Sequence, residues 1–308
     1  MKIAVLGAGA MGTLFGGILS RLNDVLLVEI NPDRVKRINE GGAIIRDADG
    51  EHSYFPKAVT DTNDQEPMDL VVVFVKAMFT ESALEANRGL IGKDTYLMTL
   101  QNGAGHEEKL LKFADREHVI IGTTQHNAAL TKEGTVWHGG TGITTIGLLD
   151  GHSEVLEPVK EMFNAAGLKC VICDEVKKQI WTKLFTNTGA SALTAVLQVP
   201  LGYLVQEEHA HEIMKTLCRE AVSVANAEGN YGFKEDEVIQ CVETVCKNAP
   251  NGYTSIYSDI KAGRHTEVDT ISGSVISAAE KLGIDVPFHT MIVSLIHAME
   301  QRPRPEEL

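Results

Sequence analysis

KIAVLGAGAMG, residues 2–12, is the stretch that decides the fold of the N-terminal half. Lys2–Leu6 is an apolar run of the kind that forms a buried parallel strand. Met11–Leu22 carries apolar residues on one face at helical spacing. Residues 7–12 fit the pattern G-x-G-x-x-G, which is informative because it directly follows a strand and opens a helix. The stretch therefore predicts the first strand, turn and helix of a dinucleotide-binding domain.

The three glycines of this pattern have different expected tasks. Gly7 allows a tight turn, Gly9 allows the backbone to approach a pyrophosphate, and Gly12 allows close packing of helix on strand. The helix N-terminus adds partial positive charge for the phosphates. A glycine-rich turn without a ligand is the alternative. The predicted cofactor-binding residues of the loop are Gly7, Ala8, Gly9, Ala10, Met11 and Gly12.

Glu29 ends the second predicted strand, Asp24–Glu29. An acidic residue about there accepts hydrogen bonds from the adenosine ribose and repels a 2′-phosphate. Glu29 is therefore predicted to bind the cofactor and to favour NAD(H). NADP(H) stays possible because Arg34 and Arg37 lie nearby in sequence and could meet the phosphate. A solvated carboxylate at the end of a strand is the alternative for Glu29 alone.

The first half alternates strand and helix patterns, which predicts a parallel sheet with crossover helices. Asn31-Pro32 is a favourable helix start, and a hairpin is expected at 43–56 around Asp49-Gly50. Further strands are expected at Asp69–Val75, Thr95–Leu100, His118–Thr123, Ile143–Leu148 and Leu168–Cys173.

Beyond Asp174, a plausible helix N-cap, strand patterns give way to amphipathic segments. We therefore predict an α/β Rossmann-type N-terminal domain at 1–173 and an all-α C-terminal domain at 174–308. The last residues, 302–308, are expected to fray. The predicted helices of the second domain are 175–197, 207–228, 234–247 and 266–282.

Composition excludes several classes of protein. The 308-residue chain is long enough for about two domains. Its net charge of -14 argues against a nucleic-acid surface, which needs clustered Lys and Arg. There is no secretory n-region at the start and no apolar stretch of the roughly 18 residues that would span a bilayer. We expect a cytoplasmic protein without membrane association.

Cysteine and histidine spacing predicts no disulfide framework and no metal site. The five cysteines are an odd number spread along the chain. Cys170 and Cys173 form a lone C-x-x-C inside a strand-like run, which favours buried structural thiols over zinc or redox chemistry. His209 and His211 are two residues apart on a predicted helix, so they face different directions.

A second group of polar residues lies in the helical half. Lys183, Asn187 and Ser191 are spaced four apart in WTKLFTNTGAS, residues 181–191, and so share one helical face. A polar stripe among Ala, Leu and Phe is costly in a packed helix unless it lines a pocket. For Lys183 alone, a solvated lysine is the more ordinary interpretation.

The other notable segment is residues 255–269, SIYSDIKAGRHTEVD. Thr266 with Asp269 could cap the helix that follows. The preceding Arg264-His265-Thr266-Glu267 is an unusually polar lead into an amphipathic helix, and His265 is expected to have a local structural role.

These residues together resemble the ketopantoate reductases, or 2-dehydropantoate 2-reductases, over essentially the whole chain. The resemblance rests on G-A-G-A-M-G at 7–12, V-K-A at 75–77 and Gln101-Asn102-Gly103. It continues through W-x-K-L-x-x-N at 181–187 and S-x-x-x-D-I-x-x-x-R-x-T-E-V-D at 255–269. It implies a C-terminal domain like that of 6-phosphogluconate dehydrogenase.

The resemblance implies hydride transfer from NAD(P)H to the keto carbon of a 2-oxo acid, giving the D-2-hydroxy acid; with ketopantoate this is a step of pantothenate biosynthesis. Lys183 would be the general acid, and Glu267 would hold it and contact substrate or cofactor. Asn102, Asn187, Ser191 and Ser255 match substrate-binding positions, and Lys76 and Asn102 match positions near the cofactor. The chemistry is reasonable, because an ammonium stabilises the alkoxide formed by hydride addition and then protonates it.

Two departures leave the substrate open. Ser191 and Leu201 stand where the family often has Asn. Leucine cannot hydrogen-bond a hydroxylated substrate, and missing polar partners discriminate strongly between substrates. With Glu29, these departures favour the branch that resembles NAD-dependent D-2-hydroxyacid dehydrogenases, acting on branched or aromatic 2-oxo acids.

Two other functions each fit part of the sequence. A non-catalytic NAD(H)-sensing protein would explain the glycine loop but not the Lys183 stripe with Glu267. A β-hydroxyacid dehydrogenase shares the architecture and uses a lysine, but lacks the Arg264–Glu267 pattern. The site is expected in a cleft between domains, since the loop and the lysine must meet at one nicotinamide. By analogy with the family, a homodimer is expected.

Overall fold

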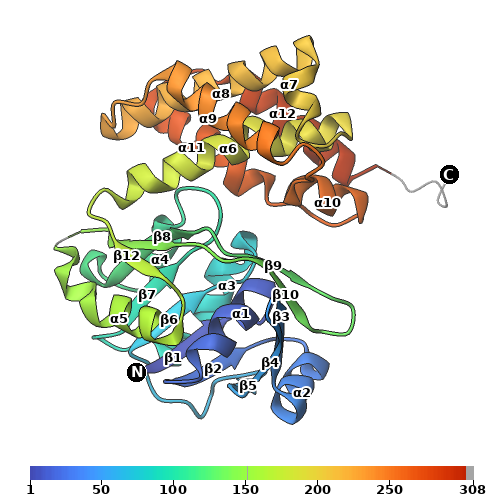
Figure 1. Cartoon of the computed structure of the whole chain (residues 1–308). Helices are drawn as coiled ribbons and strands as arrows, with labels where there is room; N and C mark the ends of the chain where they lie inside the picture. The colour runs from blue at the N-terminus through green and yellow to red at the C-terminus, as the bar shows by residue number, and fades with distance from the viewer. Residues whose placement is uncertain (151, 303–308) are drawn as a thin grey trace. The chain divides into compact units, whose positions relative to one another are not determined.

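The structure is a computed structural model that describes residues 1–150 and 152–302 (Figure 1). They form two compact units. The first unit contains Met1–Gln101 and His106–Gln179, and the second contains Asn102–Gly105 and the chain from Ile180 onward. The division thus falls inside a helix a few residues beyond the predicted boundary at 173, and it assigns a short loop of the first half to the second unit. Apart from Arg302, the tail expected to fray lies outside the described residues.

The first unit is built on an eight-stranded sheet with the order β12-β11-β8-β7-β6-β1-β2-β5. Neighbouring strands are parallel except for the antiparallel pair β8 and β11. The central strands are buried on both faces, as their continuous apolar sequences require. The strands are β1 (Lys2–Leu6), β2 (Asp24–Val28), β5 (Lys57–Val59), β6 (Leu70–Val73), β7 (Tyr96–Thr99), β8 (Val119–Thr124), β11 (Thr144–Leu148) and β12 (Cys170–Ile172).

A second sheet of four strands has the order β4-β3-β10-β9. The expected hairpin is formed by β3 (Ala43–Asp47) and β4 (Gly50–Tyr54), and Asp47 accepts hydrogen bonds from the amides of Asp49 and Gly50 in its turn. The strands β9 (Asn127–Leu130) and β10 (Val136–Gly140) were not predicted. They are short, and the glycines and polar residues in and around them conceal any regular apolar alternation.

Helices α1 (Ala10–Leu19), α2 (Pro32–Gly41) and α5 (Glu157–Ala166) belong to this unit, as do the short helices α3 (Thr80–Ala86) and α4 (Glu107–Leu110). The predicted start of α2 is confirmed, because the Asn31 side chain accepts from the amides of Asp33 and Arg34. Short 3₁₀ helices complete the unit at Ala77–Phe79, Arg88–Leu90, Arg116–His118 and Ser153–Leu156.

The second unit is helical (Figure 1). The four predicted helices are confirmed within about two residues at each end. Helices α7, α10 and α12 were not predicted, although α12 has Pro at its first turn and apolar residues at helical spacing. The helices are α6 (Val176–Leu197), α7 (Tyr203–Gln206), α8 (Glu208–Gly229), α9 (Glu235–Asn248), α10 (Ser255–Lys261), α11 (Val268–Leu282) and α12 (Pro287–Glu300).

The expected capping box at the start of α11 is wrong. The Thr266 hydroxyl accepts from the amide of Val268, two residues on, rather than from that of Asp269. The Asp269 carboxylate accepts instead from His297 of α12, at 2.9 Å. Tertiary contacts with α12 have therefore replaced the local cap, which a sequence pattern cannot anticipate.

Candidate active site

The glycine loop joins the carboxyl end of β1 to α1, and each glycine meets a different constraint. Gly7 has φ +96°, and a Cβ on it would lie 2.9 Å from the Val75 amide nitrogen. A Cβ on Gly12 would overlap the carbonyl oxygen of Gly7. A Cβ on Gly9 would meet nothing within 4 Å, and Gly9 has an extended backbone that any residue adopts. The turn and the packing therefore require Gly7 and Gly12, whereas the fold itself does not require Gly9.

The loop is held by backbone and side-chain hydrogen bonds around Ala8. The Gly7 amide donates to the Val28 carbonyl at 2.8 Å, and the Thr13 hydroxyl donates to the Ala8 carbonyl at 2.9 Å. Arg34 also donates to the Ala8 carbonyl, at 3.3 Å. In the described chain no side chain caps the N-terminus of α1 at Gly9, so its first amides are left for a ligand or water. A rigid, uncapped helix start beside open space fits the pyrophosphate of a dinucleotide.

Glu29 follows β2 directly and is buried, with 8% of its surface exposed. Its carboxylate accepts from the Asn31 amide at 3.0 Å and from Arg34 Nη1 at 3.0 Å. Arg37 donates to the carbonyl of Glu133 at 2.8 Å. Arg34 and Arg37 are the two arginines that could meet the 2′-phosphate of NADP(H). Both already donate hydrogen bonds to oxygen atoms of the protein.

Lys76 is half-buried and follows β6, whose carboxyl end is next to that of β1. The segment before it is held by Gln101, which donates to the Val75 carbonyl at 2.6 Å and whose side-chain oxygen lies 2.9 Å from the Thr99 hydroxyl. Gln101 belongs to the Gln101-Asn102-Gly103 motif, but its sequence context predicted no role for it. Because Val75 packs on Gly7, the hydrogen bond from Gln101 to the Val75 carbonyl helps to hold the glycine loop in place.

The helical unit contains the other predicted site residues. On α6, Lys183 and Asn187 are half-buried and Ser191 is buried, so the predicted polar stripe lies largely out of solvent. Burial lowers the pKa of Lys183 to about 8, although the nearby Glu267 carboxylate acts in the opposite direction. An ammonium with that pKa is charged at neutral pH and can release a proton.

Ser255 directly follows Thr254, a residue that contacts the Ser191 backbone and was not predicted to be part of the site. Thr254 caps α10 by accepting from the Tyr257 amide, and its hydroxyl lies 3.2 Å from the Ser191 carbonyl, to which it donates. The Thr194 hydroxyl also donates to that carbonyl and lies 3.0 Å from the Thr254 hydroxyl. The sequence did contain a signal for this contact, because Thr254 has a hydroxyl and directly precedes Ser255, an expected substrate-binding residue.

Asn102 belongs to the helical unit although it follows a strand of the first unit. Its neighbour Gly103 has φ +108°, and a Cβ there would overlap the carbonyl of Thr270. The Thr270 hydroxyl in turn donates to the Glu267 carbonyl at 3.2 Å. The packing of a glycine on α11 therefore places Asn102 in the same unit as Lys183 and close in the fold to the Glu267 segment.

Leu201 lies beside the segment that leads into α10. Its amide donates to the Gly252 carbonyl at 3.0 Å, and its side chain packs partly buried against the helical core. An apolar side chain thus lies beside Gly252, three residues before Ser255, where α10 begins.

The cysteines and histidines outside the predicted site show no sign of metal binding in the described residues. Burial raises the pKa of Cys170 to about 12, so it is a thiol; Cys173 is half-buried. Among the described residues, no three His, Cys, Asp or Glu side chains gather as metal ligands would. His211 pairs with Glu243 at 2.9 Å. Within residues 1–150 and 152–302, no helix combines the length and apolar character needed to cross a bilayer.

Comparison with known proteins gives matches over nearly the whole chain. Residues 3–151 match the family model "Ketopantoate reductase PanE/ApbA", and residues 175–300 match "Ketopantoate reductase PanE/ApbA C terminal". A 2-dehydropantoate 2-reductase of Streptococcus pyogenes is 31% identical over 97% of this chain and 98% of that protein. One of Pyrococcus horikoshii is also 31% identical, over the same shares.

Among solved structures, D-mandelate dehydrogenase with NADH and anilino(oxo)acetate has a TM-score of 0.90. It is 32% identical and the match covers 97% of this chain and 98% of that one.

Proposed function

Because the chain belongs to the ketopantoate reductase family, as its motifs predicted, we propose that it reduces a 2-oxo acid to the D-2-hydroxy acid with a nicotinamide dinucleotide. The observation that supports this best is the half-buried Lys183, whose pKa of about 8 suits a general acid near neutral pH. A protein that only senses NAD(H) would not need such a lysine on a face shared with Asn187 and Ser191.

The residues of the helical unit would act on the substrate. The nicotinamide, when bound, supplies the hydride. The Lys183 ammonium stabilises the negative charge that develops on the keto oxygen and donates a proton from Nζ to it. Glu267 would keep that ammonium in position, and Asn102, Asn187, Ser191 and Ser255 would hydrogen-bond the substrate. Regeneration of the ammonium then requires a proton from solvent.

NAD(H) is the preferred cofactor in this proposal. The Glu29 carboxylate, already holding Arg34, has remaining lone pairs for the ribose hydroxyls and would repel a 2′-phosphate. Arg34 already pairs with Glu29, and Arg37 already donates to the Glu133 carbonyl. The similar D-mandelate dehydrogenase was solved with NADH. Gly7, Ala8, Gly9, Ala10, Met11 and Gly12 would surround the pyrophosphate, with Lys76 nearby.

Two substrates are supported by different observations. The 2-dehydropantoate 2-reductases that match the chain support ketopantoate, hence a role in pantothenate biosynthesis. Leu201, which cannot hydrogen-bond a hydroxylated substrate, supports an aromatic or branched 2-oxo acid, as does the similarity to D-mandelate dehydrogenase. A homodimer and a cytoplasmic location remain predictions.

The decisive experiment compares NADH with NADPH in steady-state assays against ketopantoate and against phenylglyoxylate, an aromatic 2-oxo acid. We expect turnover with NADH and at least one of the two acids. A higher kcat/KM for phenylglyoxylate would assign the chain to the aromatic alternative, and a higher value for ketopantoate would assign it to pantoate formation. Binding of NADH without turnover of these or branched 2-oxo acids would contradict the proposal and favour a sensor.

A further inference from the structure

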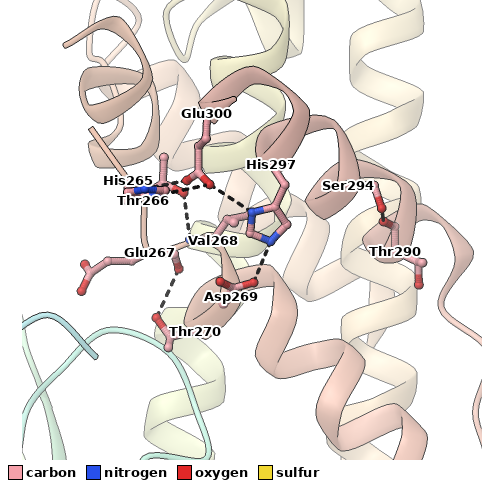
Figure 2. A network of polar contacts seen from close by, with 10 residues as sticks. All are labelled: His265, Thr266, Glu267, Val268, Asp269, Thr270, Thr290, Ser294, His297 and Glu300. Atoms are coloured by element: carbon pink, nitrogen blue, oxygen red, sulfur yellow. Dashed lines mark hydrogen bonds and ion pairs between the residues drawn. The ribbon is translucent and has the colours of Figure 1, made fainter. Parts of the chain in front are cut away.

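A buried carboxylate lies beside the segment that contains Glu267 (Figure 2). Glu300, in the last turn of α12, has only 5% of its side chain exposed. Its Oε1 accepts from the Thr266 amide at 2.8 Å, and its Oε2 accepts from His297 Nδ1 at 3.0 Å. His265 Nδ1 lies 3.6 Å from the same carboxylate. The Glu300 carboxylate therefore contacts the backbone amide of Thr266, the residue immediately before Glu267.

His297 extends this contact to the residues after Glu267. Its Nε2 lies 2.9 Å from Asp269 Oδ1, so the imidazole joins the carboxylates of Glu300 and Asp269. The hydrogen bond with Glu300 raises the pKa of His297, and Asp269 adds to the effect. Although burial alone would raise the pKa of Glu300, the Thr266 amide and His297 hold it below the ordinary value. Both shifts favour the charged forms of the pair over their neutral forms.

The backbone of Glu267 is consequently held on both sides. Thr266 is bound through its amide to Glu300, and its hydroxyl accepts from the Val268 amide at 3.2 Å. Asp269 is bound to His297, and Thr270 donates to the Glu267 carbonyl. Glu267 itself has φ -101° and ψ 27°, outside the regular helix that it precedes. Figure 2 shows its side chain directed away from the cluster of His297 and Glu300.

We propose that Glu300 and His297 are positioning residues that hold the Glu267 carboxylate toward Lys183. The inference rests on the proposed function, in which Glu267 orients the general acid. Glu267 is the N-cap of α11, so the first turn of that helix holds its carbonyl through the Ile271 amide at 3.1 Å. The buried Glu300 holds the amide of Thr266 on its other side, and the imidazole holds the Asp269 side chain. A small displacement of a group that positions a reacting atom has a large effect on rate.

The alternative is that the pair only joins α12 to α11 and contributes to stability. The two roles differ in how they depend on Glu267. A positioning role disappears when Glu267 can no longer act, whereas a stabilising role is independent of it. A double-mutant cycle on turnover therefore separates them.

The experiment measures kcat and kcat/KM for the active 2-oxo acid, with melting temperatures, in E300A, E267Q and the E300A/E267Q double variant. We expect E300A to lower kcat about tenfold when Glu267 is present and less than about twofold in the E267Q background. E300Q, which keeps an oxygen for the Thr266 amide, should lose less than E300A. H297A should resemble E300A.

The matched control is E243A, which removes the carboxylate paired with His211 between α8 and α9 of the same unit. It should leave kcat within about twofold of the unmodified protein, because Glu243 is not among the predicted site residues. Equal losses from E300A with and without Glu267, or normal turnover in a folded E300A, would overturn the positioning role while the proposed function stands. If E267Q itself turned over normally, the role of Glu267 would fail, and the positioning role with it. Should E300A not fold, the cycle is completed with E300Q and H297A.

Discussion

The two units build their candidate sites in opposite ways. In the first unit, one contiguous loop presents backbone amides, and two of its glycines are required because a Cβ would meet other backbone atoms. In the second unit, the site consists of side chains from segments far apart in sequence, with Lys183, Ser255 and Glu267 among them. Substitutions that add atoms should therefore disrupt the glycine loop. Substitutions that truncate a side chain or remove its charge should disrupt the helical site.

This difference also separates binding from chemistry. Backbone amides and a helix N-terminus recognise phosphate, but they do not exchange protons near neutral pH and so cannot act as an acid or base. The helical unit contains Lys183, whose proton affinity burial has brought near the physiological range. Substitutions in the first unit should accordingly alter cofactor affinity and selectivity, and substitutions in the second should alter turnover.

The largest effect is expected for Lys183→Ala. Loss of the general acid should lower kcat by about 10²-fold or more, while NADH affinity, measured by fluorescence titration, stays within about threefold because the loop is untouched. Lys247→Ala, an exposed lysine paired with Glu243, is the control. Near-normal turnover of K183A would remove the lysine from the acid role.

Within the glycine loop, Gly9→Ala and Gly12→Ala should differ in kind. Since Gly9 faces open space, G9A should keep its melting temperature but bind NADH about tenfold more weakly, as expected where a pyrophosphate approaches the backbone. G12A should lower the melting temperature, because its Cβ would overlap the Gly7 carbonyl. Unchanged NADH affinity in G9A would show that no phosphate lies against that glycine.

The pH dependence of turnover should follow Lys183. Because the protonated amine is the acid, kcat for reduction should be level below pH 8 and fall about tenfold per pH unit above it. The midpoint at about 8 reflects burial, which lowers the pKa from 10.5. A kcat that is flat to pH 10 would contradict either the depressed pKa or the role of Lys183.

The smallest effect is expected for cofactor selectivity. Glu29→Ala removes a carboxylate that repels a 2′-phosphate and frees Arg34 to meet it. The ratio of kcat/KM for NADPH to that for NADH should rise about tenfold. The E29A/R34A double variant should lose most of that gain, and an equal gain without Arg34 would exclude the arginine as the phosphate partner.

Local signals explain how much of the fold was predictable. The glycine loop, the central strands and the long helices each have a pattern within one continuous run of neighbouring residues, and these elements were confirmed. The strands β9 and β10 were missed because they are short and their glycines and polar residues conceal an apolar alternation, although the two strands pair with each other locally. The cap predicted at Thr266 and Asp269 was wrong because His297 and Glu300, some thirty residues away, compete for the same groups.

The sequence by itself determined the family, the two-part fold and the residue types available for chemistry. Tertiary structure alone decided that Arg34 is held by Glu29, that Asn102 belongs with the helices, and that burial lowers the pKa of Lys183. The physical reason is that a motif specifies local backbone geometry, whereas solvation and ion pairing depend on every atom around a group. Glu300 illustrates this, since nothing near it in sequence indicates that its carboxylate binds the backbone beside Glu267.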